Sequence, residues 1–211
     1  MPVITISRQY ASGGGEVAQI VAQQTNSILL DRELIYEVAQ RLGLPEDVVS
    51  EHEERGETII ARLVSALRVS YPDSLSLPDV AEAPGDFPDL SNRALVQVTE
   101  QVMQQAANGE NVVIVGRGSQ FVLRNHPRAL HVHVYAPYDS RVQAVITEQS
   151  VGRHEAERIV KDFDGARVRY ARHFYHANWQ APEHYHMLVN CGTLNREVAA
   201  DLICQAAKSI G

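Results

Sequence analysis

The sequence predicts an α/β fold of three layers, in which a parallel sheet of five strands lies between helices on both faces. Five short apolar runs, rich in β-branched residues, are separated by segments long enough for crossover helices. A glycine-rich turn and then a helical pattern follow the first run. The runs at 112–115 and 130–135 alternate little between apolar and polar residues, which is typical of parallel strands buried on both faces.

The first strand is expected over Val3–Ile6, where β-branched residues follow one another up to Ser7. The loop Arg8–Gly15 comes next, and apolar residues then recur at helical spacing at Val17, Ile20 and Val21. Strand, glycine turn and helix together make half of a βαβ unit.

The other four strands are predicted where similar runs occur. His131 and His133 interrupt one of them on a single face, because they lie two positions apart. The predicted strands are Ser27–Leu30, Val112–Val115, Leu130–Tyr135 and Tyr185–Val189.

Helical patterns fill the segments between the strands. Ser150 is expected to cap the helix that starts at His154. Four prolines between Ser70 and Asp89 predict a loop there. The predicted helices are Arg32–Leu42, Glu46–Arg55, Thr58–Val69, Ser91–Ala107, Ser140–Gln149, His154–His173 and Asn195–Lys208.

The length of 211 residues favours one domain over residues 1–211. The net charge of −7 argues against a partner nucleic acid, which would need many cationic contacts to phosphate. No apolar run approaches the roughly 18 residues of a membrane span, and residues 1–26 lack a signal-peptide pattern. Cys191 and Cys204 have no metal-ligand spacing, so the reducing cytoplasm is the expected location, with no membrane partner.

The glycine loop is the first candidate binding site, because backbone N–H groups and a helix N-terminus converge on an anion at such a turn. The candidate phosphate-binding residues are Ser12, Gly13, Gly14, Gly15 and Glu16. The P-loop pattern GxxxxGK[ST] is incomplete, since no lysine follows the glycines and Glu16 stands where a hydroxyl is expected. Arg8 and the Glu16 carboxylate are the nearest substitutes, Glu16 as a ligand of Mg²⁺. A tight turn without any ligand is the alternative.

Arginines gather late in the chain. Of the 19 basic residues 17 are arginine, and six of these lie between Arg141 and Arg172, on two predicted helices that flank a hinge at 149–152. Phosphoryl transfer needs cations around the moving phosphate and a lid that excludes water. Arg167 is the best lid candidate, and Arg172 is a second. A solvated helix face with ion pairs is the alternative.

A cluster of histidines, at positions 173, 176, 184 and 186, lies near Trp179. It lacks the firm ligand spacing of a zinc site, so an aromatic, partly exposed end of the lid is the better interpretation.

Three stretches resemble the cytidylate kinase-like family, a branch of the P-loop nucleoside monophosphate kinases: Ile4–Gly14, Leu30–Ile35 and Val113–Gly118. Further segments follow in the family's order, namely His126-Pro127, the run Leu130–Pro137 with Arg141, the pair Asp164-x-x-Arg167, Trp179 and Tyr185–Asn190.

The resemblance implies a P-loop kinase-type fold with a helical insertion for the monophosphate at 32–95 and a lid at 150–182. It implies ATP and Mg²⁺ as substrate and cofactor, and a nucleoside monophosphate as acceptor. The acceptor-binding candidates are Asp31, Tyr36, Arg117 and Arg141. Gly118 stands where the family's Gly-Arg-Asp motif has aspartate, so CMP and other small acceptors both remain candidates.

Two functions therefore follow from the sequence. In the first, the chain is a kinase in which Arg8, Arg167 and Arg172 supply the cationic charge of the absent lysine. In the second, it binds a nucleotide or another small phosphorylated ligand without turnover, as a regulatory protein. The sequence leaves the oligomeric state open.

Overall fold

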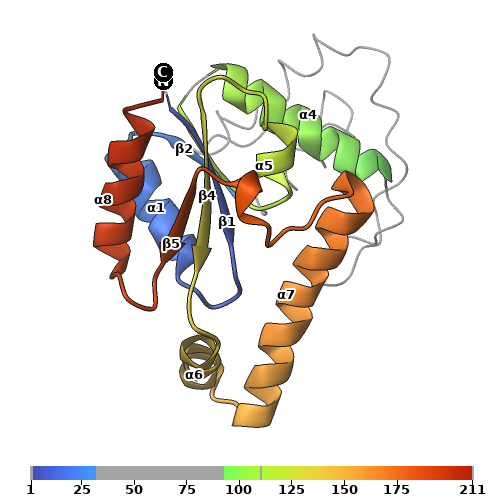
Figure 1. Cartoon of the computed structure of the whole chain (residues 1–211), viewed down its shortest axis with the longest axis vertical. Coiled ribbons are helices and arrows are strands. Elements are labelled where there is room, and N and C mark those ends of the chain that lie inside the picture. The colour runs from blue at the N-terminus through green and yellow to red at the C-terminus, as the bar shows by residue number, and fades with distance from the viewer. Residues whose placement is uncertain (1, 32–92, 110, 211) are drawn as a thin grey trace, which may run out of the picture. The chain divides into compact units, whose positions relative to one another are not determined.

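The structure, a computed structural model, describes residues 2–31, 93–109 and 111–210, and Figure 1 shows their arrangement. The elements are β1 (Val3–Arg8), α1 (Gly14–Gln24), β2 (Ile28–Leu30), α4 (Arg93–Gly109), β3 (Val112–Val115), α5 (Ser119–Val122), β4 (Ala129–Tyr135), α6 (Tyr138–Gln149), α7 (Arg153–Tyr175), a 3₁₀ turn η2 (Pro182–His184), β5 (Met187–Asn190) and α8 (Arg196–Ala207).

The five strands form one sheet in the order β2-β3-β1-β4-β5. β1 pairs in parallel with β3, where Ile4 lies opposite Val113, and with β4, where Ile4 lies opposite Leu130. β4 and β5 are also parallel, with Val134 opposite Val189. The predicted α/β fold with a parallel five-stranded sheet is confirmed.

The chain divides into two compact units, residues 1–29 with 110–211 and residues 30–109. In the second unit, α4 buries Val98, Val102 and Ala106, which recur every four residues, as the sequence predicts for a helix there. The described residues do not include the other predictions for this unit, namely the helices at 32–42, 46–55 and 58–69, the loop at 70–89 and the acceptor candidate Tyr36.

One face of the sheet in the first unit carries the apolar core. Alternate residues of β1 and β4, such as Ile6 and Val132, pack against α1 and α8, which lie side by side (Figure 1). The residues that form this core include Ile4, Ile6, Leu130, Val132, Val134, Val17, Val21, Ala199 and Ile203. Because side chains alternate along a strand, the residues between them must point to the other face.

The opposite face is polar but equally buried. Thr5 and Ser7 of β1 and His131 and His133 of β4 are each at most 5% exposed. The Thr5 hydroxyl is hydrogen-bonded to His131 Nδ1 at 2.8 Å. The expectation that the two histidines share one face of a buried strand is confirmed, and this face lies beside α5 and the segment after α7 (Figure 1).

Helices α6 and α7 follow one another across a short turn, and this helix–turn–helix pair, called the α6–α7 hairpin below, has its own small core of Val142, Val145, Ala156 and Val160. Both helices were predicted, but the expected cap is wrong. Ser150 ends α6 with a left-handed φ of 54°, and Gly152 is the N-cap of α7. A left-handed residue ends a helix, since it cannot continue the helical turn, and Ser150 thereby belongs to the helix before it.

Other boundaries differ from the sequence prediction by a few residues. β1 continues to Arg8 and β5 begins only at Met187, while the short elements α5 and η2 were not predicted. A helix of four residues is too short to show a hydrophobic period, which explains why α5 escaped the pattern. No helix among the described residues combines the length and apolar character needed to cross a membrane.

Candidate functional site

The glycine loop leaves the carboxyl end of β1 and is fastened to β4. The Gln9 amide donates to the Val134 carbonyl at 3.0 Å, and the Ser12 hydroxyl donates to the Gln9 carbonyl at 2.8 Å and to the Val134 carbonyl at 3.3 Å. Ala11 and Gly13 have positive φ values of 55° and 80°. The Ser12 hydroxyl is therefore used inside the loop, and a ligand would meet the backbone that follows it.

The first turn of α1 offers that backbone. No described residue accepts a hydrogen bond from the amides of Gly14, Gly15 or Glu16, and the Gly13 carbonyl already begins the helix by accepting from Val17. Free N–H groups at the positive end of a helix favour an anion. The loop thus keeps the donors that phosphate binding requires.

Arg8 reaches across this loop. A Cβ atom added at Gly14 would overlap the Arg8 Cβ, and one added at Gly116 would overlap the Arg8 guanidinium. The Arg8 side chain therefore runs from the glycine loop to the turn after β3, where its guanidinium lies. The P-loop pattern fits this loop in two registers. With Gly14 as the second glycine, the lysine falls at position 15 and the hydroxyl at Glu16; with Gly13 as the second glycine, the first glycine falls at position 8 and the lysine at position 14. In the second register the cation and the glycine have exchanged positions 8 and 14.

Glu16 forms an ion pair that the sequence analysis missed. Its partner is Arg196, the first residue of α8, whose Nε lies 3.1 Å from the place of a Cβ on Gly13. Both side chains are substantially exposed. The available signal was topological, since Arg196 follows the last strand and the carboxyl ends of parallel strands share one edge of the sheet.

Arg117 lies at the same edge, in the turn between β3 and α5. Gly116, Arg117 and Gly118 all have positive φ, and the Tyr175 hydroxyl donates to the Arg117 carbonyl at 3.4 Å. A Cβ at Gly118 would overlap the Tyr175 ring. The ring of Tyr175 therefore explains why glycine stands at this position.

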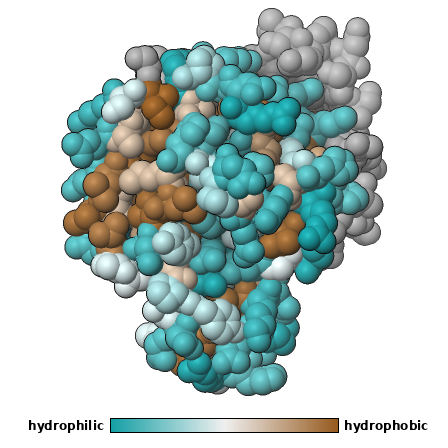
Figure 2. Space-filling model, in the orientation of Figure 1, coloured by the Kyte–Doolittle hydropathy of each residue, from teal (hydrophilic) through white to brown (hydrophobic). Residues whose placement is uncertain are grey.

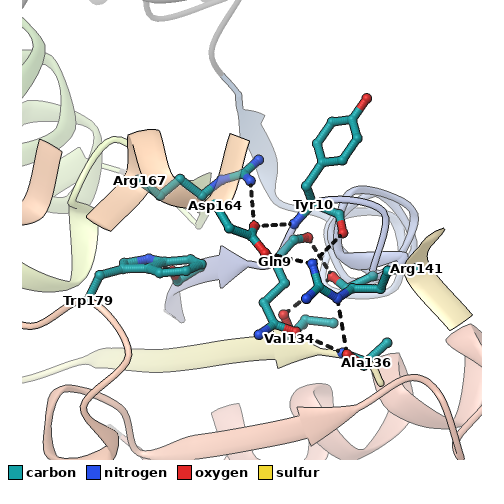
Figure 3. Close-up of polar contacts among 10 residues, drawn as sticks. Gln9, Tyr10, Val134, Ala136, Arg141, Asp164, Arg167 and Trp179 are labelled. Carbon is teal, nitrogen blue, oxygen red and sulfur yellow. Dashed lines mark hydrogen bonds and ion pairs between the residues drawn. The ribbon is translucent and has the colours of Figure 1, made fainter. Parts of the chain in front are cut away.

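Asp164 of α7 is the centre of a polar cluster beside the loop (Figure 3). Its Oδ2 accepts from Arg141 at 2.6 Å, and its Oδ1 accepts from the Tyr10 amide at 2.8 Å and from Arg167 at 3.1 Å. Arg141 also donates to the carbonyls of Ala136 and Tyr10. One carboxylate thus joins α6, α7 and the glycine loop, and it faces two guanidinium groups.

The Tyr10 ring strengthens this junction. It stacks on Phe163 with ring centroids 4.2 Å apart, and the Arg167 guanidinium lies over it at 5.8 Å. Tyr10 and Ala11 also pack against the small core of the α6–α7 hairpin. The loop and the hairpin are therefore coupled through both apolar and polar contacts.

The arginines predicted as cationic groups differ in their surroundings. The Arg141 side chain is 7% exposed and has three oxygen acceptors, whereas the Arg167 side chain is 23% exposed and among the described residues is held by Asp164 alone. Burial lowers the pKa of Arg167 from its ordinary value, while Asp164 acts in the opposite direction. A guanidinium nevertheless stays protonated in proteins. Arg172 is exposed, about 140° around the helix from Arg167.

Behind the loop, the polar face of the sheet forms a buried network. Trp179 Nε1 donates to the Ser7 hydroxyl at 2.7 Å, and the Tyr185 hydroxyl donates to the Trp179 carbonyl at 2.6 Å. Gln120 donates to the Tyr185 hydroxyl at 3.2 Å. Burial raises the pKa of Tyr185 to about 12 and lowers that of His133 to about 4, so both groups are neutral near pH 7. Trp179 is buried, not part of an exposed lid end as expected.

Of the other predicted acceptor residues, Asp31 follows β2 in the second unit, and Tyr36 lies outside the described residues. The structure does bring together Arg8, the loop 12–16 and the turn of Arg117, and it joins Arg141 and Arg167 to the loop through Asp164. In the described part of the chain no group of three or more His, Cys, Asp or Glu side chains could hold a metal ion.

Comparisons with known proteins support this geometry. Residues 3–193 match the model of the cytidylate kinase-like family. The cytidylate kinase of Paraburkholderia phymatum (strain DSM 17167 / CIP 108236 / LMG 21445 / STM815) is 32% identical over 95 residues, which make up 44% of this chain and only 40% of that relative's own length.

Solved structures are also similar to this chain. An uncharacterized protein from Eubacterium ventriosum ATCC 27560 is similar over 99% of both chains, with a TM-score of 0.71 and 19% identity. A shikimate kinase from Bacteroides thetaiotaomicron is similar over 98% of this chain and 95% of its own, with a TM-score of 0.48 and 13% identity.

Proposed function

The chain belongs to the cytidylate kinase-like family, and from this premise we propose that it transfers a phosphoryl group from ATP to a nucleoside monophosphate, with CMP one candidate, or to a related small acceptor. The observation that carries the proposal is the position of Arg8. Its Cβ and Cγ lie against Gly14, in the first turn of α1, where the backbone amides have no acceptor among the described residues, and its guanidinium reaches Gly116. This permanent positive charge supports Arg8 as the substitute for the absent lysine.

In the proposed reaction, an oxygen of the acceptor phosphate forms a bond to the terminal phosphorus of ATP. The bond from that phosphorus to its bridging oxygen breaks, and ADP leaves with the electron pair. The chain needs to hold the two substrates in line and to neutralise the spreading charge. Arg8 and the loop amides hold the donor phosphates, Arg117 the acceptor phosphate, and Arg167 the transferred group.

Mg²⁺ is the cofactor that the family implies, and the donor set at the loop fits it in part. Mg²⁺ is commonly held by one or two carboxylates together with substrate phosphates, and Glu16 offers one exposed carboxylate at the loop. When bound, the ion would neutralise phosphate charge. Glu16 would then exchange Arg196 for the ion, which leaves Arg196 available to a phosphate.

The direct test is a coupled assay of ADP formation with ATP and a panel of nucleoside monophosphates, including CMP. One acceptor is expected to stimulate ADP formation, and Arg8→Ala and Arg167→Ala are expected to lower the rate by about 10³-fold or more. Arg158→Ala is the matched control, because Arg158 lies on α7 but pairs only with exposed carboxylates among the described residues. Full activity of both Arg8→Ala and Arg167→Ala would refute the roles proposed for these two arginines.

A second candidate function is binding of a nucleotide or phosphorylated ligand without turnover, as in a regulatory protein. Glycine at position 14 favours it, since a P-loop lysine normally reaches the outer phosphates. Tight binding of ATP with no ADP formation for any acceptor would favour this function. Equal ATP affinity with and without Mg²⁺ would count against the role of Glu16.

A further inference from the structure

The Asp164 cluster contains more positive than negative charge. Two guanidinium groups, those of Arg141 and Arg167, face the single carboxylate of Asp164. His133 nearby does not change this balance, because burial lowers its pKa to about 4. Among the described residues, one positive charge beside the glycine loop is therefore left for an anionic ligand.

The two arginines are not equivalent partners of Asp164. Arg141 is bound at 2.6 Å, is almost fully buried, and has two backbone carbonyls as additional acceptors. Arg167 is bound at 3.1 Å and is more exposed. Separating Arg141 from Asp164 would leave an uncompensated charge in the interior. Arg167, in contrast, can exchange Asp164 for another anion at little cost.

Asp164 also fixes the loop directly. Its Oδ1 accepts from the Tyr10 amide (Figure 3), and the Tyr10 ring stacks on Phe163, the neighbour of Asp164 on α7. The position of Arg167 relative to the loop is thus set by a carboxylate that both elements share. Preorganisation of this kind lowers the cost of ordering a long side chain when a ligand binds.

We propose that Asp164 is a positioning residue that holds Arg167 ready beside the glycine loop, and that a polyphosphate bound there takes Arg167 over from Asp164 while Arg141 stays in place. This inference rests on the proposed function for the site, but it concerns binding and does not require transfer. It deepens that function by naming Arg167 as the arginine that leaves a protein carboxylate for a phosphate of the ligand.

The experiment titrates the protein with ATP and, separately, with inorganic pyrophosphate. Binding is followed by the fluorescence of Trp179, the one tryptophan, which donates a hydrogen bond to Ser7 just before the loop. Asp164→Asn is expected to weaken both ligands by about tenfold or more. Asp139→Asn is the matched control: Asp139 pairs with Arg153 on the same hairpin, also at 2.6 Å, but is exposed. It is expected to bind within about twofold of wild type.

A double-mutant cycle separates positioning from a merely structural role. In the Arg167→Gln background, Asp164→Asn is expected to have less than about a twofold further effect on affinity, because Asp164 acts through Arg167. Additive losses would overturn the proposal. Tighter binding by Asp164→Asn would also overturn it, since the carboxylate would then simply repel the phosphates.

A crystal structure of the wild-type chain with pyrophosphate covers the case in which Asp164→Asn does not fold. Arg167 is expected on a phosphate oxygen and Arg141 still on Asp164, and Arg167 unmoved would overturn the proposal. If Asp164 and Arg167 prove coupled in ligand binding but no monophosphate accepts a phosphoryl group, the proposed function alone is refuted. Transfer with no effect of Asp164→Asn would refute this inference alone, and absence of binding by wild type would refute both.

Discussion

At the scale of single residues, the site depends on which side chains share a small space. Arg8 and Gly14 illustrate this, since a Cβ at position 14 would overlap the Arg8 side chain. A lysine at 14 and an arginine at 8 are therefore mutually exclusive in this loop. Under the proposed function, Arg8 excludes the P-loop lysine and supplies a positive charge in its place.

This exclusion predicts the outcome of exchanging the two residues. Gly14→Lys alone is expected to destabilise the fold by roughly 1–3 kcal/mol and to weaken ATP binding, because the loop is overpacked. Arg8→Gly combined with Gly14→Lys is expected to recover most of both losses. Urea unfolding and calorimetry with ATP measure them, and a Gly14→Lys variant that matches wild type would contradict the overlap.

Arg117 gives a second prediction at this scale. Its turn lies at the carboxyl edge of the sheet, where open α/β folds bind ligands. Loss of a charged hydrogen bond costs about 1.5–3 kcal/mol, so Arg117→Ala is expected to bind the acceptor monophosphate about ten- to a hundredfold more weakly. Calorimetry with the monophosphate is the measurement. Arg124→Ala is the control, an exposed arginine after α5, and unchanged affinity of a folded Arg117→Ala would exclude the contact.

At the scale of elements, helix α8 connects the core to the loop. Val198 and Leu202 are exposed on this helix, and Figure 2 shows an apolar surface over it. Its first residue, Arg196, pairs with Glu16, and its N-cap Asn195 accepts from the Val198 amide at 2.8 Å. The start of α8 thus sets where a cation lies above Gly13.

The cap predicts a measurable stability change. Asn195→Ala is expected to lower the free energy of unfolding by about 1 kcal/mol, because one helix donor loses its acceptor. Asn195→Asp retains the acceptor and is expected to stay near wild type. Urea unfolding followed by Trp179 fluorescence measures both, and equal stability of the alanine variant would show that the cap contributes nothing.

At the scale of the whole molecule, the polar face of the sheet makes stability depend on pH. Burial lowers the pKa of both His131 and His133 to about 4. In the unfolded chain the pKa of histidine is about 6.5, so the unfolded state binds more protons between pH 6.5 and 4. The stability is fully present above pH 6.5 and is lost as the pH falls toward 4.

The expected loss is on the order of 3 kcal/mol per histidine across that range, at about 1.4 kcal/mol per pH unit. Free energies of unfolding measured at several pH values for wild type and His133→Gln are the test. The variant is expected to have a shallower slope between pH 6.5 and 4, whereas His154→Gln, at an exposed position, is expected to keep the wild-type slope. Identical slopes for all three proteins would rule out a buried neutral His133.

Structural features that depend on residues close together in the chain were predicted well. The runs Val112–Val115 and Leu130–Tyr135 gave strands within one residue of their observed bounds, because alternation and β-branching act along a few neighbouring positions. The end of α6 at Gln149 was predicted, but the role of Ser150 was wrong, because a serine can cap a following helix or end a preceding one, and local sequence does not distinguish the two.

By itself, the sequence determined the parallel α/β fold and the family resemblance, since periodicity and motif spacing are local properties, and it predicted the glycine loop as a place for phosphate. Only the tertiary structure decided what surrounds that loop. Tyr10 and Asp164 are 154 residues apart in the chain, yet they share a hydrogen bond. Arg196 meets Glu16 and Arg8 covers Gly116 for the same reason: strands that are distant in sequence end at one edge of the sheet.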